Sequence, residues 1–340
     1  MTHLTFAEAI IVGLIQGTTE LFPVSSLGHN VLIPALVGGS WANDLNVAKA
    51  ESPYLAFVVG LHVATAIGIT VYFWRDWVRI IGGFFTSIAR REIKTADQKL
   101  AWMIIVATIP VGLTGLIFEH SFRVIFGVPS RAAIFLIVNG IILYAGERFR
   151  TRKSREADQQ VMKEREAEPA LVTAGRGPGT ARAVGARVGG AHTSGQRAIR
   201  QHEMVSAIQA DRRITSFTFW QAVLIGSAQI LALLAGISRD GVTMVAGMFR
   251  GLSREDAARF AFLLATPVIL AAGVLKIPDL LGPLGNGIRP QIIAGSLVAG
   301  IAAYLSVRFL MKYFQTRTLT PFAIYCLVFG LASVIYLSVR

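Results

Sequence analysis

The sequence predicts an all-α polytopic membrane protein made of two inverted-topology repeats, each a re-entrant helix pair plus three transmembrane helices. Three observations lead to this fold class. Hydrophobic residues make up 53% of the 340 residues and charged residues only 16%, against about 25% charged residues in an average globular domain. Long apolar runs alternate with short basic segments, and the two halves of the chain match each other at a fixed offset.

The first repeat, residues 1–150, begins with two apolar runs that are each too short to cross a bilayer. They cover 6–22 and 26–38 and are separated by Pro23-Val-Ser-Ser, whereas a spanning helix needs about 20 apolar residues. Non-helical backbone at membrane depth is tolerated only where it lines protein or a water-filled cavity, so we interpret the two runs as a re-entrant helix pair. Full spans are expected at 54–74, 101–118 and 131–149.

Residues 151–214 differ in kind from the membrane segments. They are rich in Arg, Glu, Gly and Ala, with almost no large apolar residue, which predicts a basic low-complexity insert outside the bilayer, disordered or loosely helical. The second repeat, residues 215–340, resumes with another short broken pair at 217–234 and 239–249. Further full spans are expected at 257–276, 291–310 and 320–338.

A shift of 213 positions, which carries Phe6 onto Phe219, aligns the two halves. The other matches in this register are Ala9 with Ala222, Gly13 with Gly226, Gln16 with Gln229, Ser25 with Ser238 and Gly28 with Gly241. An odd number of spans in each repeat gives the repeats opposite orientations, and the broken helices of inverted repeats meet near the membrane midplane. We therefore expect residues 16–29 to meet residues 229–243.

The basic residues indicate the orientation in the membrane. Thirteen of the 33 Lys and Arg fall in 150–213, and loops 75–99 and 311–319 on the same side are also basic, whereas loops 119–130 and 277–290 on the other side are not. Cytoplasmic loops are enriched in Lys and Arg, so the basic side is expected in the cytoplasm. The net charge of +13 then reflects topology, and we expect no nucleic-acid partner.

The first tip, from Gln16 to His29, carries polar residues whose burial in lipid is costly and therefore indicates a functional site. Gln16 and Glu20 lie four residues apart on one helix face, where they can hold a hard divalent cation, Mg²⁺ or Ca²⁺. Ser26 can attack phosphorus or donate a hydrogen bond, and His29 can act as a general acid or base. The sequence leaves Ser26, His29 and water open as the nucleophile. Taken singly, these residues also fit a packed polar pair, a helix cap and a structural histidine.

The second tip runs from Ala235 to Thr243 and contains Arg239, whose guanidinium matches phosphate bidentately. Ser25 and Ser238 precede short helices, whose free N–H groups attract anions. These features together predict a phosphate site. For two other polar residues we favour structural roles: core packing for His62, and an interfacial position for Glu147 at a span end.

Two stretches resemble motifs of the undecaprenyl-diphosphatase family, the bacitracin-resistance membrane phosphatases of bacteria. The family's first motif, Glu/Gln-x-x-x-Glu followed by Pro-Val-Ser-Ser-x-Gly-His, matches the stretch from Gln16 to His29. The second, Pro-Gly-x-Ser-Arg-Ser-Gly-x-Thr, matches at Gly236, Ser238, Arg239, Gly241 and Thr243. The likeness covers both membrane halves but not the insert.

The resemblance implies a phosphoric anhydride hydrolase of the bacterial plasma (inner) membrane. It would hydrolyse undecaprenyl diphosphate, a C55 lipid, to undecaprenyl phosphate and inorganic phosphate at the outer face, with a divalent cation, recycling the carrier lipid for peptidoglycan synthesis. By position, the resemblance implies catalytic roles for Glu20, Ser26, His29 and Arg239, substrate binding by Gln16, Ser25, Ser238 and Thr243, and metal binding by Gln16 and Glu20.

Four residues depart from the family pattern: Gln16 replaces the commoner Glu, Ala235 replaces Pro, Asp240 replaces Ser and Cys326 replaces Arg. Asp240 places a carboxylate beside Arg239, where it can pair with the guanidinium and compete with phosphate. The alternatives are a divergent paralogue with weak phosphatase activity, a transporter or flippase for polyprenyl-phosphate lipids, and a scaffold. The expected partners are a polyprenyl diphosphate substrate and membrane lipids, and the oligomeric state stays open, a homo-oligomer included.

Overall fold

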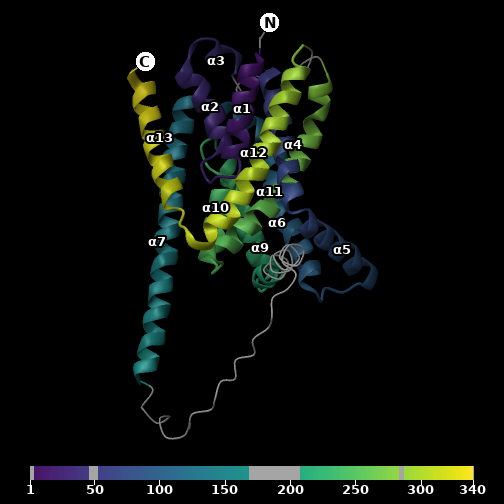
Figure 1. The fold of residues 1–340 in the computed structure, drawn as a ribbon, viewed down its shortest axis with the longest axis vertical. Coiled ribbons are helices and arrows are strands. Elements are labelled where there is room, and N and C mark those ends of the chain that lie inside the picture. The colour runs from purple at the N-terminus through teal and green to yellow at the C-terminus, as the bar shows by residue number, and fades with distance from the viewer. Residues whose placement is uncertain (1–3, 46–52, 168–206, 283–286, 340) are drawn as a thin grey trace, which may run out of the picture.

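The computed structural model describes residues 4–45, 53–167, 207–282 and 287–339. These residues form helices and connecting turns, with no strand among them, so the predicted all-α class is confirmed. The start of α1 and the end of α13 lie at the same end of an elongated bundle (Figure 1).

The first half opens with two short helices, as predicted. α1 (Phe6–Thr19) and α2 (Ser26–Val37) pack against each other, with the bend between them inside the bundle, and α3 (Gly39–Asp44) follows. Thr5 and Glu8 form a capping box that starts α1, a reciprocal arrangement that satisfies two free N–H groups. The longer helices of this half are α4 (Pro53–Tyr72), α6 (Ala96–Phe126) and α7 (Pro129–Ala167).

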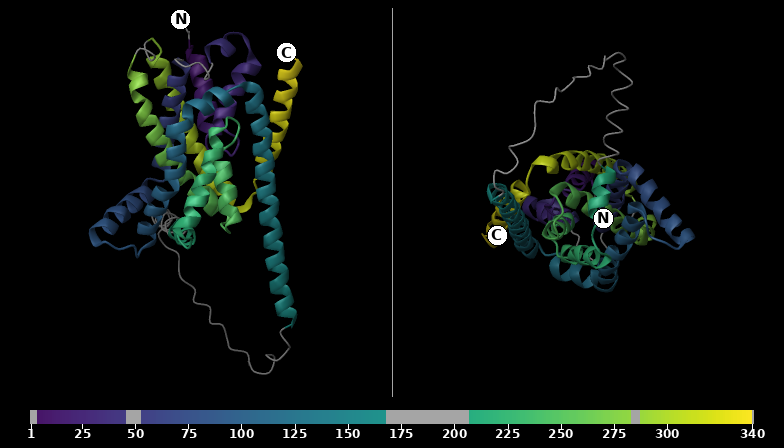
Figure 2. Two further views of the ribbon diagram at one scale, coloured as in Figure 1. Left: turned by 180° about the vertical axis from the view of Figure 1, so that it is seen from behind. Right: turned by 90° about the horizontal axis from the view of Figure 1, so that it is seen from below.

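The second half repeats this order. A broken segment consists of α9 (Phe219–Ser227), the 3₁₀ helix η1 (Ala228–Leu233) and α10 (Arg239–Phe249). A capping box of Thr218 and Gln221 starts α9, as Thr5 and Glu8 start α1. The longer helices are α11 (Arg254–Leu281), α12 (Arg289–Thr316) and α13 (Thr320–Val339). The α1–α2 pair occupies the end of the bundle that holds the α13 terminus, and α9 and α10 lie toward the opposite end (Figure 2).

Each broken segment packs on a long helix of the other half. α1 lies against α12, and α9 lies against α6. A Cβ atom added at Gly13 would collide with the carbonyl oxygen of Gly295, and one added at Gly226 would collide with that of Ala107. Small residues are typical of membrane helices whose backbones approach closely, so these two glycines allow the halves to interlock.

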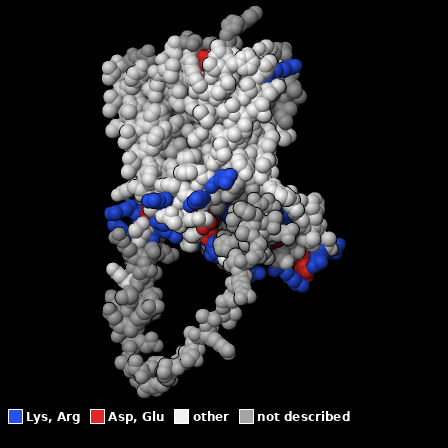
Figure 3. Space-filling model, in the orientation of Figure 1, with Lys and Arg blue, Asp and Glu red and all other residues white. Residues whose placement is uncertain are grey.

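The surface has the character of a membrane protein. Among the described residues, five helices are long and apolar enough to cross a bilayer, or up to seven spans are present if each bent pair counts as one. The upper part of the face in Figure 3 is nearly free of charged side chains, and Lys and Arg gather at the lower end. These features indicate a multi-pass membrane protein. Five of the six predicted spans qualify singly, and the one predicted at 54–74 belongs to a bent pair.

The predicted loops were partly wrong. Loop 75–99 contains α5 (Trp74–Arg90), which is bent by 86° from the preceding helix. Its apolar residues stand among arginines but recur every three or four positions, which is the pattern of an amphipathic helix. Parts of the predicted loops 119–130 and 277–290 are also helical, because α6 and α11 continue into them.

The predicted insert is helical at both described ends. α7 continues beyond the membrane-like part of its sequence to Ala167, and a short helix, Ala207–Ile214, precedes α9. Residues 168–206 lie outside the described residues. The predicted character of the insert as a whole therefore stays a prediction.

Candidate active site

The two tips have the same local construction. Ser25, with a φ of 69°, precedes α2, and its hydroxyl accepts a hydrogen bond from the N–H of Gly28 at 3.2 Å. Ser238 precedes α10, and its hydroxyl accepts from Gly241 at the same distance. The prediction that both serines stand at helix starts is confirmed, and each tip presents a helix N-terminus, which attracts anions.

The tips meet, as the sequence predicts. A Cβ atom added at Gly28 would lie 2.9 Å from the Cα atom of Gly236. Asn139 of α7 joins the tips: its amide donates to the carbonyl of Pro23 at 2.9 Å, and its oxygen accepts from the N–H of Ser238 at 3.0 Å. Asn139 is fully buried, so the two hydrogen bonds form where water does not compete.

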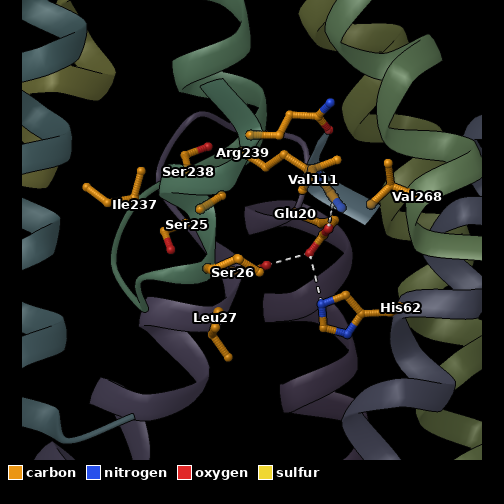
Figure 4. Close-up of a pocket in the computed structure, with 13 residues that line it drawn as sticks. Glu20, Ser25, Ser26, Leu27, His62, Val111, Ile237, Ser238, Arg239 and Val268 are labelled. Carbon is orange, nitrogen blue, oxygen red and sulfur yellow. Dashed lines mark hydrogen bonds and ion pairs between the residues drawn. The ribbon is translucent and has the colours of Figure 1, made fainter. Parts of the chain in front are cut away.

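Glu20 is the centre of the polar cluster between the tips (Figure 4). One carboxylate oxygen forms an ion pair with the guanidinium of Arg239. The other accepts hydrogen bonds from the Ser26 hydroxyl and, at 2.7 Å, from the Gln16 amide. The Nε2 atom of His62 lies 3.4 Å from the same oxygen. Residues of both halves thus converge on one buried carboxylate.

A cavity of about 150 Å³ opens beside this carboxylate. Its polar lining comes from Glu20, Ser25, Ser26, His62, Gln229, Ser238 and Arg239. An engineered cavity of about 150 Å³ in another protein holds benzene, so this one has room for a phosphoryl group. Apolar side chains, among them Leu27, Val111 and Val268, complete the wall.

Five of the predicted site residues line this cavity: Glu20, Ser25, Ser26, Ser238 and Arg239. Three do not. The Gln16 side chain is outside the cavity lining: its amide nitrogen donates to Glu20, and its oxygen accepts from the Asn30 amide at 2.6 Å. The Thr243 hydroxyl donates to the carbonyl of Arg239 at 2.7 Å, within its own helix.

His29 also lies outside the cavity lining and faces α13. Its Nδ1 atom is 2.7 Å from the Ser25 carbonyl, and its Nε2 atom is 2.7 Å from the Tyr325 hydroxyl. The imidazole also stacks on Phe329. In this arrangement the imidazole holds the first tip against α13.

Asp240 does not pair closely with Arg239. Its nearer carboxylate oxygen is 3.9 Å from the guanidinium, which is engaged with Glu20. Asp240 is 1% exposed, and neither carboxylate oxygen has a hydrogen-bond partner among the described residues. The guanidinium of Arg239 is thus paired with Glu20 rather than closely with Asp240, and competition between Asp240 and phosphate stays a prediction.

Four buried or cavity-lining polar residues were missed or misjudged in the sequence. The prediction of core packing for His62 was wrong, because its ring lines the cavity. Glu147, expected at an interface, is buried and ion-paired with Arg254. Asn139 and Gln229 were not singled out as site residues, although each is a polar residue in an apolar segment, the signal that should have identified them.

The donors at the cavity match a resident metal ion only in part. No group of three His, Cys, Asp or Glu able to hold a metal occurs in the described parts of the chain. Both oxygens of Glu20 are engaged with Arg239, Ser26 and Gln16, and the Gln16 oxygen is engaged with Asn30. Hard divalent cations take six or more oxygen ligands, so the predicted metal pair of Gln16 and Glu20 is not a preformed site.

Comparisons with known proteins agree with the predicted motifs. A family model described as "Bacitracin resistance protein BacA" matches residues 9–173 and 179–332. The chain is 54% identical over 338 residues to an undecaprenyl-diphosphatase of Mycolicibacterium paratuberculosis, covering 99% of each chain. It is 53% identical over 340 residues to undecaprenyl-diphosphatase 2 of Frankia alni, covering 97% of each. A Burkholderia orbicola protein also named undecaprenyl-diphosphatase 2 is 36% identical over 325 residues, covering 94% of this chain and 93% of that protein. With nearly the whole chain matched, this protein belongs to the bacitracin resistance protein BacA family.

Proposed function

We propose that this protein hydrolyses undecaprenyl diphosphate to undecaprenyl phosphate and inorganic phosphate. The observation that carries the proposal is the convergence of Glu20 and Ser26 from one half with Arg239 from the other on a cavity between two helix N-termini. Guanidinium groups and helix N-termini both bind phosphate. The names of relatives that are up to 54% identical support the choice of substrate.

Substrate entry exchanges one ion pair for another. Arg239 is held by Glu20, and its Nε atom has no hydrogen-bond partner among the described residues. A diphosphate in the cavity offers Arg239 a bidentate anion. As the guanidinium turns toward phosphate, Glu20 loses its counter-ion and becomes a stronger proton acceptor. Binding of the diphosphate therefore makes Glu20 better able to accept the proton of the Ser26 hydroxyl.

Gln229 is a further contact for the diphosphate in this proposal. It is 1% exposed and lines the cavity, and neither its amide nitrogen nor its amide oxygen has a hydrogen-bond partner among the described residues. An unsatisfied buried amide costs about 1–3 kcal/mol. A phosphate oxygen that accepts from Gln229 removes part of this cost, which favours the bound state.

Ser26 is the nucleophile that the geometry favours. Its hydroxyl already donates to Glu20, the arrangement of a nucleophile with its base. The Ser26 oxygen bonds to the terminal phosphorus, the bond from that phosphorus to the bridging oxygen breaks, and undecaprenyl phosphate leaves. The hydroxyl proton passes to Glu20. Water then attacks the phosphoserine, Glu20 returns the proton to the Ser26 oxygen, and inorganic phosphate is released.

The other predicted site residues support this centre. Gln16 and His62 hold Glu20 from two sides, and Thr243 fixes the first turn of α10 beside Arg239. Catalysis by His29 and substrate binding by Thr243 stay predictions. Since Gln16 and Glu20 are not a preformed metal site, a divalent cation, Mg²⁺ or Ca²⁺, is proposed to enter with the diphosphate, whose charge it would neutralise.

We also propose that the cavity serves the outer face of the bacterial plasma membrane, where hydrolysis recycles the carrier lipid. The basic end of the molecule in Figure 3 fits the cytoplasmic side. The α1–α2 pair then enters from outside and α9 and α10 from inside, which supports the inverted-repeat interpretation.

A phosphate-release assay on purified protein with undecaprenyl diphosphate tests the proposal. Wild type is expected to release phosphate in the presence of Mg²⁺ or Ca²⁺, and Ser26→Ala is expected to lose this activity. Substrate labelled in the terminal phosphate should label Ser26 after rapid quenching. Retained lipid binding without phosphate release under any divalent cation would instead support a transporter. Full activity of Ser26→Ala would exclude Ser26 as the nucleophile and leave water and His29.

A further inference from the structure

α5 is an amphipathic helix at the charged end of the molecule. It leaves the bundle at 86° to the preceding helix (Figure 2). At 100° per residue, one face carries a stripe of large apolar residues, each at least half exposed: Trp74, Val78, Ile81, Phe85 and Ile88. The opposite face packs on α6, where Trp102 donates to Ser87 at 2.9 Å. Such helices lie in the interface plane of a membrane with the apolar face in lipid.

A basic pocket of about 570 Å³ lies beside α5, between the α5–α6 connection and the short helix before α9. Its charged lining residues are Arg79, Lys94, Lys99, Arg212, Asp97 and Asp211. Positive side chains outnumber negative ones, so the pocket favours an anion.

The two carboxylates of the pocket, Asp97 and Asp211, are already neutralised by arginines. Arg79 lies 2.8 Å from Asp97 and 2.8 Å from Asp211, and Asp211 also pairs with Arg259 at 2.9 Å. These ion pairs fix α5, α6, α11 and the short helix relative to one another. The walls of the pocket are therefore held in place without a ligand.

Two cations of the pocket have no carboxylate partner in the described parts of the chain. Lys99 and Arg212 line it but take part in none of the ion pairs there, whereas Lys94 pairs with Glu92. Both are accessible, since Lys99 is half-buried and Arg212 is exposed. They supply the positive charge that remains after the internal pairs are formed.

We propose that this pocket binds the headgroup of an anionic phospholipid from the leaflet in which α5 lies. A phosphate headgroup matches the two free cations. The apolar stripe indicates that α5 lies in the membrane interface, where phospholipid headgroups are found, and this location favours a lipid headgroup over free phosphate. The site lies at the charged end of the molecule and does not depend on the proposed hydrolysis.

Native mass spectrometry of the full chain in detergent tests the proposal, with phosphatidylglycerol and phosphatidylcholine as probes. Wild type is expected to retain phosphatidylglycerol several-fold better than phosphatidylcholine. Lys99→Gln/Arg212→Gln should reduce phosphatidylglycerol retention to the phosphatidylcholine level. The control Arg90→Gln/Arg91→Gln removes the same charge from exposed residues that do not line the pocket, and it should bind like wild type.

Equal retention of both lipids, or unchanged retention by the pocket variant, would overturn the proposal. Full displacement of the lipid by excess inorganic phosphate would assign the pocket to a free anion and overturn it as well. Lys99→Arg/Arg212→Lys keeps the charges and should restore binding. If the glutamine variant does not fold, loss of binding in this conservative variant with a wild-type melting curve would count against the proposal, and retention would support it.

Discussion

The Glu20–Arg239 pair gives the sharpest test of the site, because removing both charges should restore part of the stability without restoring activity. Glu20→Gln leaves a largely buried guanidinium without its anion, and Arg239→Gln leaves a buried carboxylate without its cation. The double variant Glu20→Gln/Arg239→Gln removes both charges. All three variants are expected to lose phosphate release while still inserting into the membrane.

The exposures of the side chains set the size of the stability effect. The Glu20 side chain is 4% exposed and that of Arg239 17%, and breaking a buried ion pair from one side costs about 3–5 kcal/mol. Arg239→Gln should lie at the lower end, since Ser26, Gln16 and His62 still contact Glu20. The double variant should be more stable than the sum of the single effects by about 0.5–3 kcal/mol.

A second buried pair of closely matched exposure provides the control. Glu147 and Arg254 have side-chain exposures of 5% and 20% and lie at the charged end of the bundle. The four variants of each pair are compared by denaturant-induced unfolding in detergent and by phosphate release. Glu147→Gln/Arg254→Gln should show the same coupling in stability but retain activity. Additive stability effects at Glu20 and Arg239, or full activity in either single variant, would refute the reasoning.

Other parts of the site and its packing lead to further predictions. Asn139→Leu leaves the buried carbonyl of Pro23 and the buried N–H of Ser238 unpaired. It should lower the free energy of unfolding by about 2–6 kcal/mol, at about 1–3 kcal/mol for each group; an unchanged free energy of unfolding would argue that Asn139 does not hold the two tips together. Gln229→Leu should raise KM for the diphosphate without lowering stability, and a KM equal to that of wild type would remove Gln229 from the substrate site. Gly226→Ala should reduce thermal stability because its Cβ meets the Ala107 carbonyl, whereas Gly82→Ala, which meets nothing within 4 Å, should not; equal melting temperatures would contradict the close packing. Chelation with EDTA should abolish phosphate release, with recovery on adding Mg²⁺ or Ca²⁺, but leave the melting temperature unchanged, since the described residues contain no preformed metal site; a large drop in melting temperature would indicate a resident ion.

The periodic and compositional signals were sufficient for most of the fold. Apolar runs located the long helices, and serine before a short apolar run located the starts of α2 and α10. The failures came from α5 and from the helix extensions, where charged residues among apolar ones resemble a loop. An 86° bend within one apolar stretch depends on packing against α6, which local sequence does not encode.

The site was predictable where its residues lie on the tips and less so where they lie on long helices. Glu20 and Arg239 stand in polar tips, so their meeting followed from the repeat. His62 and Asn139 reach the same place from α4 and α7, and the rotation of a long apolar helix decides which face they occupy. The outward turn of His29 likewise depends on the position of Tyr325 on α13.

The interlocking of the halves has a consequence for biosynthesis. α1 is among the first helices made, but its packing partner α12 lies near the end of the chain, and α9 rests on α6, made long before it. A nascent chain that ends after α7 has the first tip but neither Arg239 nor the α12 surface that supports α1. Phosphatase activity should therefore be absent from every intermediate of translation and arise only once α12 has entered the membrane.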